Sequence, residues 1–497
     1  MAKTSPEILL TFIPLDKTAK QPIYIQVYNG IKEGILSGML KPKDRMPASR
    51  ILAQQLSIAR NCVILAFEQL ILEGYLIAKI GAGTFVADLD NIQLPKGKRH
   101  SSTPIQEHDI DQNLAVVNTL SHLTYVHDDC AFKPMVPFQT SVPSFADFPF
   151  VIWAKIAASI YKKIGSLHLG YDDSQGYLPL RESIAKHLRL NRSINCLSGH
   201  IVIVNGSLQA VHLIAEMLLK KGDRCWMEDP GYGGAKSAMT RFGAVICPIR
   251  INQSGIDLDY AVVNYPDAKL VYVTPSHQYP MGITMPLNAR INLLGHASKH
   301  NMFVIEDDYD SDFRYNGRPI AALKAIDTEG RVLYVGTFSK SLFPALRIGY
   351  LVLPTLEMAK KFASLKASAD RQNPIIDQAI LHEFMRSGNF ERHIRKMRLL
   401  YKQAQDNLAM LLSEQLGNKI RLFPVDAGMH FVIEFLHKID TDLVRQHAGK
   451  MGLVLMAVDD LAIEFKNPNT FLIGFTGYSM PQLTKGVELL KSVIDLK

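Results

Sequence analysis

The sequence lacks several features that would each assign it to a distinct class of proteins. It has no uninterrupted run of the ~18 apolar residues that a membrane-spanning helix needs. Its first residues show no basic region followed by an apolar block and a small-residue cleavage site. Its 5 cysteines form no Cys-x-x-Cys pair, so neither a disulfide framework nor a cysteine metal site is predicted. We therefore expect a soluble cytoplasmic protein with no bound metal and no membrane partner.

The composition is that of an ordinary globular protein. Hydrophobic residues make up 47% and charged residues 21% of the 497 residues, which excludes collagen-like, wholly disordered and coiled-coil chains. A chain of this length exceeds a single hydrophobic core, so we predict at least two folding units. The net charge of +8 is compatible with a polyanionic partner such as nucleic acid, but a similar excess occurs in proteins that bind none.

Residues 1–89 have the pattern of a small helical domain that ends in a hairpin. Apolar residues recur every four positions in residues 23–36, and helical periodicity returns in residues 47–56 and 60–73. We expect Ser49 or a neighbour to cap the second of these helices. Residues 75–86 contain two short β-rich runs around a glycine turn, as in a β-hairpin. Helices followed by a hairpin in this order predict a winged helix-turn-helix domain.

The rest of the chain divides into two parts that differ in composition and in the pattern of apolar residues. Residues 90–133 are polar, with few aromatic side chains, which predicts a linker. In residues 134–497, short apolar runs alternate with longer helical stretches, as is typical of a mostly parallel sheet covered by helices on both faces. The sequence therefore predicts a multidomain α/β protein.

Segments of the large region that carry polar groups lie at the ends of predicted strands, where open α/β sheets bind ligands. Asn205, Gly206 and Ser207 follow one strand and open a helix, so backbone N–H groups and the Ser207 hydroxyl can bind a phosphate. Helix capping alone explains a Gly-Ser pair equally well. Asp307 and Tyr309 follow another strand. A carboxylate there can hold the protonated nitrogen of a pyridoxal ring, and a tyrosine can donate to the ring oxygen.

The acidic segment alone is equally compatible with a divalent metal site. Its carboxylates belong to Glu306, Asp307, Asp308, Asp310 and Asp312. A third segment favours the cofactor, because it places Lys340 between hydroxyl side chains and Arg347 seven residues later. A lysine can form a Schiff base with an aldehyde, while Thr337, Ser339 and Arg347 can hold a phosphate dianion. These segments together predict a pyridoxal 5′-phosphate site with Lys340 as the aldimine lysine.

The order of the motifs resembles that of the MocR regulators, a branch of the GntR family. The large region is similar to their fold-type I aminotransferase domain in Asn-Gly-Ser-Leu-Gln-Ala, Thr-Pro-Ser-His-Gln-Tyr-Pro-Met-Gly, Glu-Asp-Asp-Tyr-Asp and Gly-Thr-Phe-Ser-Lys. The first region is similar to their winged helix in Met-Pro-Ala-Ser-Arg-Ile-Leu-Ala and Gly-Ala-Gly-Thr-Phe-Val. The matching segments span nearly the whole chain except the linker. The resemblance implies a transcription regulator that binds double-stranded DNA with two half-sites and forms a head-to-tail homodimer.

The resemblance also implies roles for individual residues. Lys340 takes the position of the aldimine lysine, Asp307 that of the pyridine-nitrogen partner and Tyr309 that of the donor to the ring oxygen. Tyr232 takes the position of the aromatic residue that stacks on the ring. Tyr171 reaches the phosphate in the neighbouring subunit, although a purely structural role for it is an equal alternative. The other cofactor-binding positions are Gly206, Ser207, Thr337, Ser339 and Arg347.

In the DNA-binding domain, the resemblance implies that the third helix enters the major groove and that the hairpin tip enters the minor groove. The residues nearest the duplex are then Arg45, Ser49, Arg50, Arg60, Asn61, Lys79 and Gly81. The serine and threonine that flank the Arg-Asn pair in the family are Ala59 and Cys62 here. We therefore expect an unusual base preference.

Two departures from the family pattern bear on the ligand of the large domain. Aminotransferases bind the substrate carboxylate with an arginine where this chain has Leu472, and Gly234 replaces an arginine that a GABA-responsive member uses. We expect little transaminase turnover, no catalytic residue beyond Lys340, and pyridoxal phosphate itself as the effector of a regulator of vitamin B6 metabolism. The alternatives are an amino compound such as GABA, taurine or a D-amino acid, bound as an external aldimine, or an active aminotransferase. Arg421 or a residue of the turn 427–430 is a candidate replacement clamp.

Overall fold

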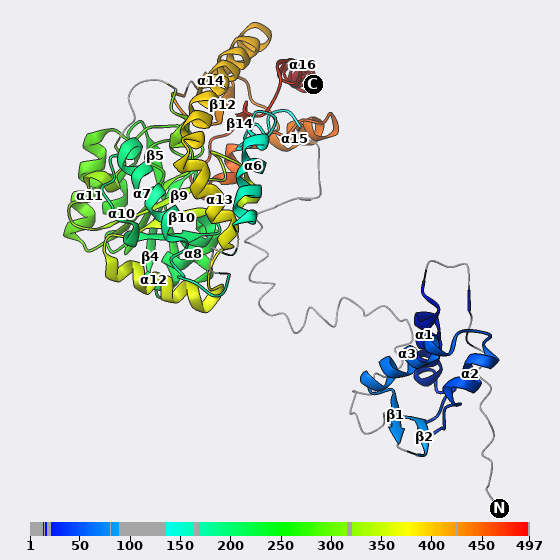
Figure 1. The fold of residues 1–497 in the computed structure, drawn as a ribbon. Helices are drawn as coiled ribbons and strands as arrows, with labels where there is room; N and C mark the ends of the chain where they lie inside the picture. The colour runs from blue at the N-terminus through cyan, green and yellow to red at the C-terminus, as the bar shows by residue number, and fades with distance from the viewer. Residues whose placement is uncertain are drawn as a thin grey trace, which may run out of the picture. The chain divides into compact units, whose positions relative to one another are not determined.

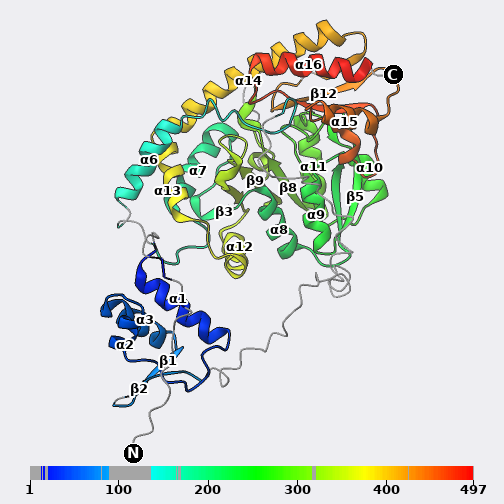
Figure 2. The ribbon, with the colours of Figure 1, turned by 90° about the vertical axis from the view of Figure 1, so that its right-hand side faces the viewer.

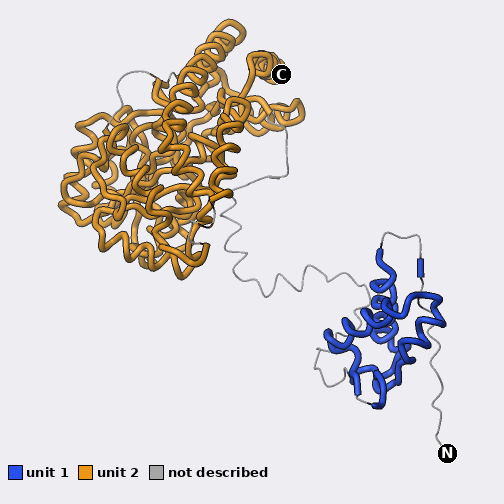
Figure 3. Tube along the Cα trace, in the orientation of Figure 1, with its two compact units in different colours: residues 1–117 blue, residues 118–497 orange. Residues whose placement is uncertain are grey.

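The computed structural model describes residues 13, 15–16, 21–79, 81–88, 136–163, 165, 169–315, 321–423 and 425–495 (Figures 1 and 2). The chain divides into two compact units, Met1–Val117 and Asn118–Lys497, which Figure 3 colours separately. The predicted linker, residues 90–133, lies outside the described residues. The boundaries 1–89, 90–133 and 134–497 therefore stay predictions.

The N-terminal unit has the predicted helices and hairpin. Its helices are α1 (Ile23–Leu36), α2 (Ser49–Gln55) and α3 (Arg60–Leu72), and β1 (Leu76–Lys79) pairs antiparallel with β2 (Gly83–Val86). Val27 and Ile31 of α1 and Leu70 of α3 are completely buried, because the periodic apolar faces of these helices meet in one core. Gly81 in the hairpin turn has a φ of +76°, a conformation that glycine adopts without strain. The prediction of a winged helix-turn-helix is confirmed.

The start of α2 differs from the prediction in one respect. Ser49 is the first helical residue, and the preceding Ala48 holds the cap position without a side-chain hydrogen bond. The backbone is still extended at Ala48, with a ψ of 141°, so the neighbour of Ser49 holds the cap position and the helix begins one residue earlier than it would with Ser49 as the cap. The Ser49 hydroxyl instead accepts a hydrogen bond from Arg60 Nε at 3.3 Å, which joins α2 to α3.

The described strands of the large unit form an eight-stranded sheet in the order β3-β10-β9-β8-β7-β4-β5-β6. Their bounds are β3 (Ile201–Val204), β4 (Arg224–Asp229), β5 (Val245–Asn252), β6 (Gly255–Ile256), β7 (Leu270–Val273), β8 (Phe303–Asp308), β9 (Val332–Thr337) and β10 (Gly349–Val352). The strands from β5 through β4, β7 and β8 to β9 are parallel, and β10 runs antiparallel to its neighbours β3 and β9. The prediction of a mostly parallel sheet is confirmed.

Helices cover both faces of this sheet (Figure 2). One apolar cluster packs α8 (Ser207–Leu218), α9 (Gly233–Arg241) and α12 (Leu356–Ala369) on one face. Two further clusters hold α7 (Leu178–Arg192), α10 (Leu258–Asn264) and α11 (Leu287–Lys299) against the sheet strands. Because the central strands are buried on both sides, their sequences are continuous apolar runs without alternation.

The C-terminal part adds a second, antiparallel sheet in the order β11-β12-β14-β13. Its strands are β11 (Ile420–Phe423), β12 (His430–Phe435), β13 (Met456–Ala457) and β14 (Thr470–Gly474). The remaining α-helices are α6 (Phe150–Lys162), α13 (Ile375–Arg386), α14 (Asn389–Leu416), α15 (Thr441–Lys450) and α16 (Met480–Asp495). Short 3₁₀ turns are η4 (Ser198–His200), η5 (Ser311–Phe313), η6 (Lys324–Ile326), η7 (Pro344–Leu346) and η8 (Val458–Leu461). Within the described ranges, no helix has the length and apolar character that a membrane span requires.

Candidate cofactor site and DNA-binding surface

Asp307 is a buried residue among those predicted to bind the cofactor, and one of its carboxylate oxygens has no hydrogen-bond partner among the described residues. Tyr272 of β7 donates a hydrogen bond to Oδ2 at 2.7 Å, whereas Oδ1 is buried without a hydrogen-bond partner among the described residues. Burial raises the pKa of Asp307 to about 7, and Lys340 opposes this shift. An unpaired buried acceptor is costly. A protonated pyridine nitrogen would supply both the missing donor and a compensating positive charge, so Asp307 fits the predicted cofactor.

Lys340 follows β9 and lies close enough to Asp307 to interact with it electrostatically. Its Nζ donates a hydrogen bond to the backbone oxygen of Ser141 at 3.3 Å. Burial lowers the pKa of Lys340, although Asp310 and Asp307 partly offset this effect. A lowered pKa increases the fraction of neutral amine, which is the form that attacks an aldehyde.

The predicted phosphate residues lie where α8 begins. Gly206 precedes this helix with a φ of +121°. Gly349 of β10 approaches it so closely that a Cβ at position 349 would lie 2.9 Å from Gly206 Cα. A Cβ at Gly206 would lie 3.7 Å from the terminal nitrogens of Arg347, whose side chain is exposed. The N-terminal N–H groups of α8, the Ser207 hydroxyl and a guanidinium are therefore neighbours, which suits a phosphate.

Two more hydroxyls lie near Lys340, that of Thr337 at the end of β9 and that of Ser339 on the segment that follows. The Thr337 hydroxyl donates to Ser339 Oγ at 3.0 Å and accepts from the Ser339 backbone N–H at 3.1 Å. This pairing fixes the turn that carries Lys340, and it keeps both hydroxyls at the carboxyl end of the strand.

The phosphate segment is held in place by a residue that the sequence analysis missed. Asp370, after α12, accepts hydrogen bonds from Asn205 Nδ2 at 3.1 Å and from Gln209 Nε2 at 2.6 Å. It also pairs with the buried Lys366 at 2.8 Å. These contacts tie both ends of the Gly206 turn to α12. No local sequence pattern predicts these contacts, because Asn205 and Asp370 are 165 residues apart.

Tyr232 lies at the N-terminus of α9, where its ring is packed against Gly234. A Cβ at position 234 would lie 2.5 Å from Tyr232 Cζ. The ring also makes an edge contact with Tyr279, with the two ring centroids 6.2 Å apart. Glycine at position 234 thus allows this placement of the Tyr232 ring, and a larger residue there would displace it.

The position of the absent carboxylate clamp is filled by apolar side chains. Leu472 of β14 is completely buried in a cluster with Val432 and Val458, against which Tyr279 and Met456 pack. The cluster offers no cation to a carboxylate in this place.

The two candidate replacement clamps have other surroundings. Arg421 is 60% exposed and pairs with Glu434 of the neighbouring strand at 3.0 Å. In the turn 427–430, His430 Nε2 lies 3.1 Å from the Pro280 carbonyl oxygen. Burial, with a smaller contribution from His277, lowers the pKa of His430 to about 4, so this ring is neutral at pH 7.

Tyr309 is joined to two residues that were not among the predicted site residues. Its hydroxyl lies 3.0 Å from His277 Nδ1, which in turn lies 2.8 Å from Asp310 Oδ2. Both residues belong to motifs that the sequence analysis singled out, since His277 is in Thr-Pro-Ser-His-Gln-Tyr-Pro and Asp310 in the acidic segment. Their spacing in sequence gave no sign that they meet.

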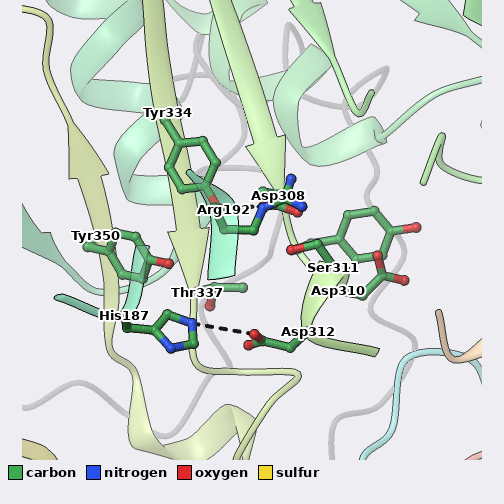
Figure 4. Close-up of a pocket in the computed structure, with 10 residues that line it drawn as sticks. His187, Arg192, Asp308, Asp310, Ser311, Asp312, Tyr334, Thr337 and Tyr350 are labelled. Atoms are coloured by element: carbon green, nitrogen blue, oxygen red, sulfur yellow. Dashed lines mark hydrogen bonds and ion pairs between the residues drawn. The ribbon is translucent and has the colours of Figure 1, made fainter. Parts of the chain in front are cut away.

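Two other carboxylates of the acidic segment, Asp308 and Asp312, face basic side chains of α7 (Figure 4). Asp308 pairs with Arg192 at 2.7 Å, and Asp312 lies 3.4 Å from His187 Nε2. Successive residues of a strand point to opposite faces, so Asp308 points away from Asp307. Among the described residues, no three His, Cys, Asp or Glu side chains are grouped as metal ligands.

Tyr171 projects from the surface of the large unit. Its side chain is 75% exposed, and the Arg371 guanidinium lies 4.3 Å from its ring centroid. An exposed tyrosine is what a contact with a neighbouring subunit requires.

The predicted DNA-binding residues are accessible in the N-terminal unit. Ser49 is half-buried, and the exposed ones are Arg45, Arg50, Arg60, Asn61, Lys79 and Gly81. Arg45 forms a backbone bridge to Phe85 of the hairpin, and its guanidinium lies beside Gly83. Lys79 Nζ lies 5.4 Å from the Phe85 ring centroid. Basic groups thus lie on the hairpin as well as on α2 and α3, as a DNA-binding surface requires.

Comparisons with known proteins match both units. Residues 23–86 match the family of bacterial regulatory proteins called gntR, and residues 133–488 match the class I and II aminotransferases. The chain is 31% identical over 480 residues to the probable rhizopine catabolism regulatory protein MocR of Rhizobium meliloti, covering 96% of this chain and 95% of that protein. It is 27% identical over 456 residues to the pyridoxine biosynthesis transcriptional regulator PdxR of Corynebacterium glutamicum, covering 90% and 91% of the two chains.

A solved structure resembles the large unit. The crystal structure of Pyrococcus horikoshii kynurenine aminotransferase, solved with PMP, superposes with a TM-score of 0.68 and 28% identity, covering 77% of this chain and 95% of that one. The fold that carries Asp307 and Lys340 is therefore one in which a related protein holds a pyridoxamine cofactor.

Proposed function

Because this chain belongs to the MocR branch of the GntR transcription regulators, with a DNA-binding winged helix-turn-helix and an aminotransferase-like domain, we propose that its large domain binds pyridoxal 5′-phosphate as an effector. Occupancy of that domain then alters the binding of operator DNA. The observation that carries this proposal is the buried Oδ1 of Asp307, which has no partner in the part of the chain that the structure describes and lies on a carboxylate that interacts electrostatically with Lys340.

Each site residue has a part in holding the cofactor. When bound, pyridoxal phosphate supplies an aldehyde and an electron-withdrawing ring. Asp307 pairs with the ring nitrogen and Lys340 holds the aldehyde, while Tyr232 and Tyr309 hold the ring. The phosphate is bound by a set of N–H, hydroxyl and guanidinium groups: Gly206, Ser207, Thr337, Ser339 and Arg347.

The apolar cluster at Leu472 supports a role in sensing over one in amino acid transamination. A buried arginine–carboxylate contact contributes about 1.5–3 kcal/mol, and neither Leu472 nor Gly234 makes one. We propose that turnover with amino acids is low, that pyridoxal phosphate itself is the effector, and that the protein regulates vitamin B6 metabolism. The PdxR relative of Corynebacterium glutamicum, a pyridoxine biosynthesis regulator by its name, supports this choice.

The proposal extends to the assembly. Residues 1–89 form the DNA-binding domain, residues 90–133 the linker and residues 134–497 the effector domain. Two copies form a head-to-tail homodimer in which Tyr171 of each copy reaches the partner's phosphate. Operator DNA then has two half-sites, one for each winged helix, and Arg45, Ser49, Arg50, Arg60, Asn61, Lys79 and Gly81 contact it.

The test is a fluorescence anisotropy titration of the cofactor-free protein onto DNA from its own upstream region, with and without pyridoxal phosphate. We expect pyridoxal phosphate alone to change the affinity. The Lys340→Ala variant should lose the visible absorption of the bound cofactor and require more cofactor for the same effect on DNA. Specific DNA binding that ignores pyridoxal phosphate but responds to an added amine would overturn this choice of effector, and steady transamination would favour an enzyme.

A further inference from the structure

Tyr309, His277 and Asp310 form a hydrogen-bonded chain in which the histidine and the aspartate are buried and the tyrosine is half-buried. The Tyr309 hydroxyl lies 3.0 Å from His277 Nδ1, and the same nitrogen lies 2.8 Å from Asp310 Oδ2. His277 is 1% exposed and Asp310 is 3% exposed. A single ring nitrogen therefore has two oxygen neighbours, and the position of its proton decides what the tyrosine hydroxyl does.

The carboxylate selects one tautomer of His277. An ionised carboxylate only accepts hydrogen bonds, so Nδ1 must carry the proton to satisfy Asp310. A protonated Nδ1 cannot accept from Tyr309, and the hydroxyl oxygen can then only receive from this N–H. The hydroxyl proton of Tyr309 is left free for a different acceptor.

The far side of the ring agrees with this assignment. His277 Nε2 is buried without a hydrogen-bond partner among the described residues. An unpaired buried N–H is less well tolerated than an unpaired acceptor. We therefore assign the proton of His277 to Nδ1 and leave Nε2 unprotonated.

Close packing holds the ring in this orientation. A Cβ at Gly428 would lie 2.2 Å from His277 Cε1 and 2.8 Å from Asp310 Oδ2, and one at Gly282 would lie 3.2 Å from His277 Nε2. The ring of His430 packs at a centroid distance of 5.6 Å. Two glycines thus leave room for the histidine and for its contact with Asp310.

We propose that His277 and Asp310 are positioning residues, which direct the hydroxyl proton of Tyr309 away from the histidine and toward the ring oxygen of bound pyridoxal phosphate. The inference rests on the proposed binding of this cofactor, and it adds a reason for the presence of a histidine in the Thr-Pro-Ser-His motif. A hydrogen bond to the ring oxygen stabilises its ionised form and so sets the pH at which the visible absorption of the bound cofactor changes.

The test is a spectrophotometric pH titration of the full-length protein with bound pyridoxal phosphate. His277→Phe keeps a ring and removes Nδ1, whereas His277→Asn keeps an N–H donor near the same place. We expect His277→Phe to raise the midpoint by about one pH unit, corresponding to about a tenfold change. His277→Asn should stay near the wild-type midpoint.

Tyr309→Phe provides the second arm of the experiment. It should raise the midpoint as His277→Phe does, and the double variant should match Tyr309→Phe alone, because the histidine acts through the tyrosine. A further shift in the double variant, or no shift with His277→Phe, would overturn the proposal. If His277→Phe does not fold, judged by thermal unfolding, Asp310→Asn replaces it with the same expectation.

Failure of this inference can be distinguished from failure of the proposed function. If the wild-type protein shows no visible absorption with pyridoxal phosphate, the cofactor proposal is wrong. If the wild-type absorption is present but its midpoint does not depend on His277, only the positioning role is wrong.

Discussion

Asp307 is buried at a site where, in the cofactor-free protein, the hydrogen bond from Tyr272 and the charge of Lys340 do not outweigh the effect of burial on its pKa. Its pKa is raised to about 7, first of all by burial, and repulsion from Asp308 and Asp310 adds to the shift. The folded, cofactor-free protein therefore favours the protonated form of the Asp307 carboxyl below about pH 7. A ligand with a protonated ring nitrogen would offset the cost of ionising the buried Asp307 carboxyl. Binding of such a ligand is therefore coupled to the charge of Asp307.

The pH dependence of stability tests this coupling. The unfolded chain releases the Asp307 proton near pH 4, whereas the folded, cofactor-free protein holds it until about pH 7. Between these values the folded state binds more protons, so this residue's contribution to stability falls as the pH rises. We expect Asp307→Asn to gain about 2 kcal/mol relative to wild type between pH 5 and pH 8, measured by urea unfolding.

A second carboxylate offers a matched control. The pKa of Asp327 is lowered, because hydrogen bonds from the backbone N–H groups of Val332 and Arg331 and the charge of Lys324 outweigh burial. Asp327 is ionised in both the folded and the unfolded state above pH 5, so Asp327→Asn should cost the same stability at pH 5 and pH 8. An equally constant difference for Asp307→Asn would show that its carboxyl is ionised throughout.

At the scale of helices and strands, elements with a distinct apolar pattern were predictable from the sequence. The helix in residues 23–36 agrees with α1, which buries an apolar face of regular spacing. The strand at the acidic segment agrees with β8, which is a continuous apolar run buried on both faces of the sheet. The short α2 has Ala48 rather than Ser49 at its cap position, and the Ser49 hydroxyl accepts a hydrogen bond from Arg60 instead of capping the helix.

The contacts between elements were not predictable in this way. Tyr272 reaches Asp307 from the neighbouring strand, 35 residues away in sequence, and His277 meets Asp310 across 33 residues. Asp370 and Asn205 meet across 165 residues. Such pairs depend on strand order and loop paths, which single-sequence periodicity does not encode. The sequence motifs predicted the residues that bind the cofactor. The residues that orient them could be found only from the three-dimensional fold.

Helix α3 carries the prediction for DNA binding. Arg60 is its first residue, and Ser49 holds Arg60 Nε at 3.3 Å. This contact leaves the two terminal nitrogens of the guanidinium for a phosphate. We expect Arg60→Ala to weaken DNA binding and to lower the slope of log affinity against log salt by about one, measured by anisotropy at several salt concentrations.

Ser49→Ala is the control variant, because it leaves the charge of Arg60 unchanged. It removes the contact that positions Arg60 but keeps the guanidinium, so binding should weaken less and the salt slope should stay unchanged. An unchanged slope for Arg60→Ala, together with a relaxed sequence preference, would place Arg60 on a base edge.

At the scale of the whole molecule, each unit has a hydrophobic core of its own. The N-terminal core draws its buried residues from positions 13–86, and the buried cores of the large unit draw theirs from positions 138–493. A ligand that binds one folded unit stabilises that unit directly. If it also regulates the other unit, it does so by changing how the winged helices meet DNA, without changing whether they fold.

Calorimetry of the full chain separates these two modes of regulation. We expect two unfolding transitions, of which pyridoxal phosphate raises only that of the large unit. The stabilisation should approach about 2.7 kcal/mol when the free cofactor concentration is 100 times its Kd, and Lys340→Ala should reduce it at the same concentration. Operator DNA should raise only the other transition. A cofactor that raised both transitions together would show that binding energy reaches the winged helix itself, and regulation would then act through the stability of the DNA-binding domain rather than through its placement on the two half-sites.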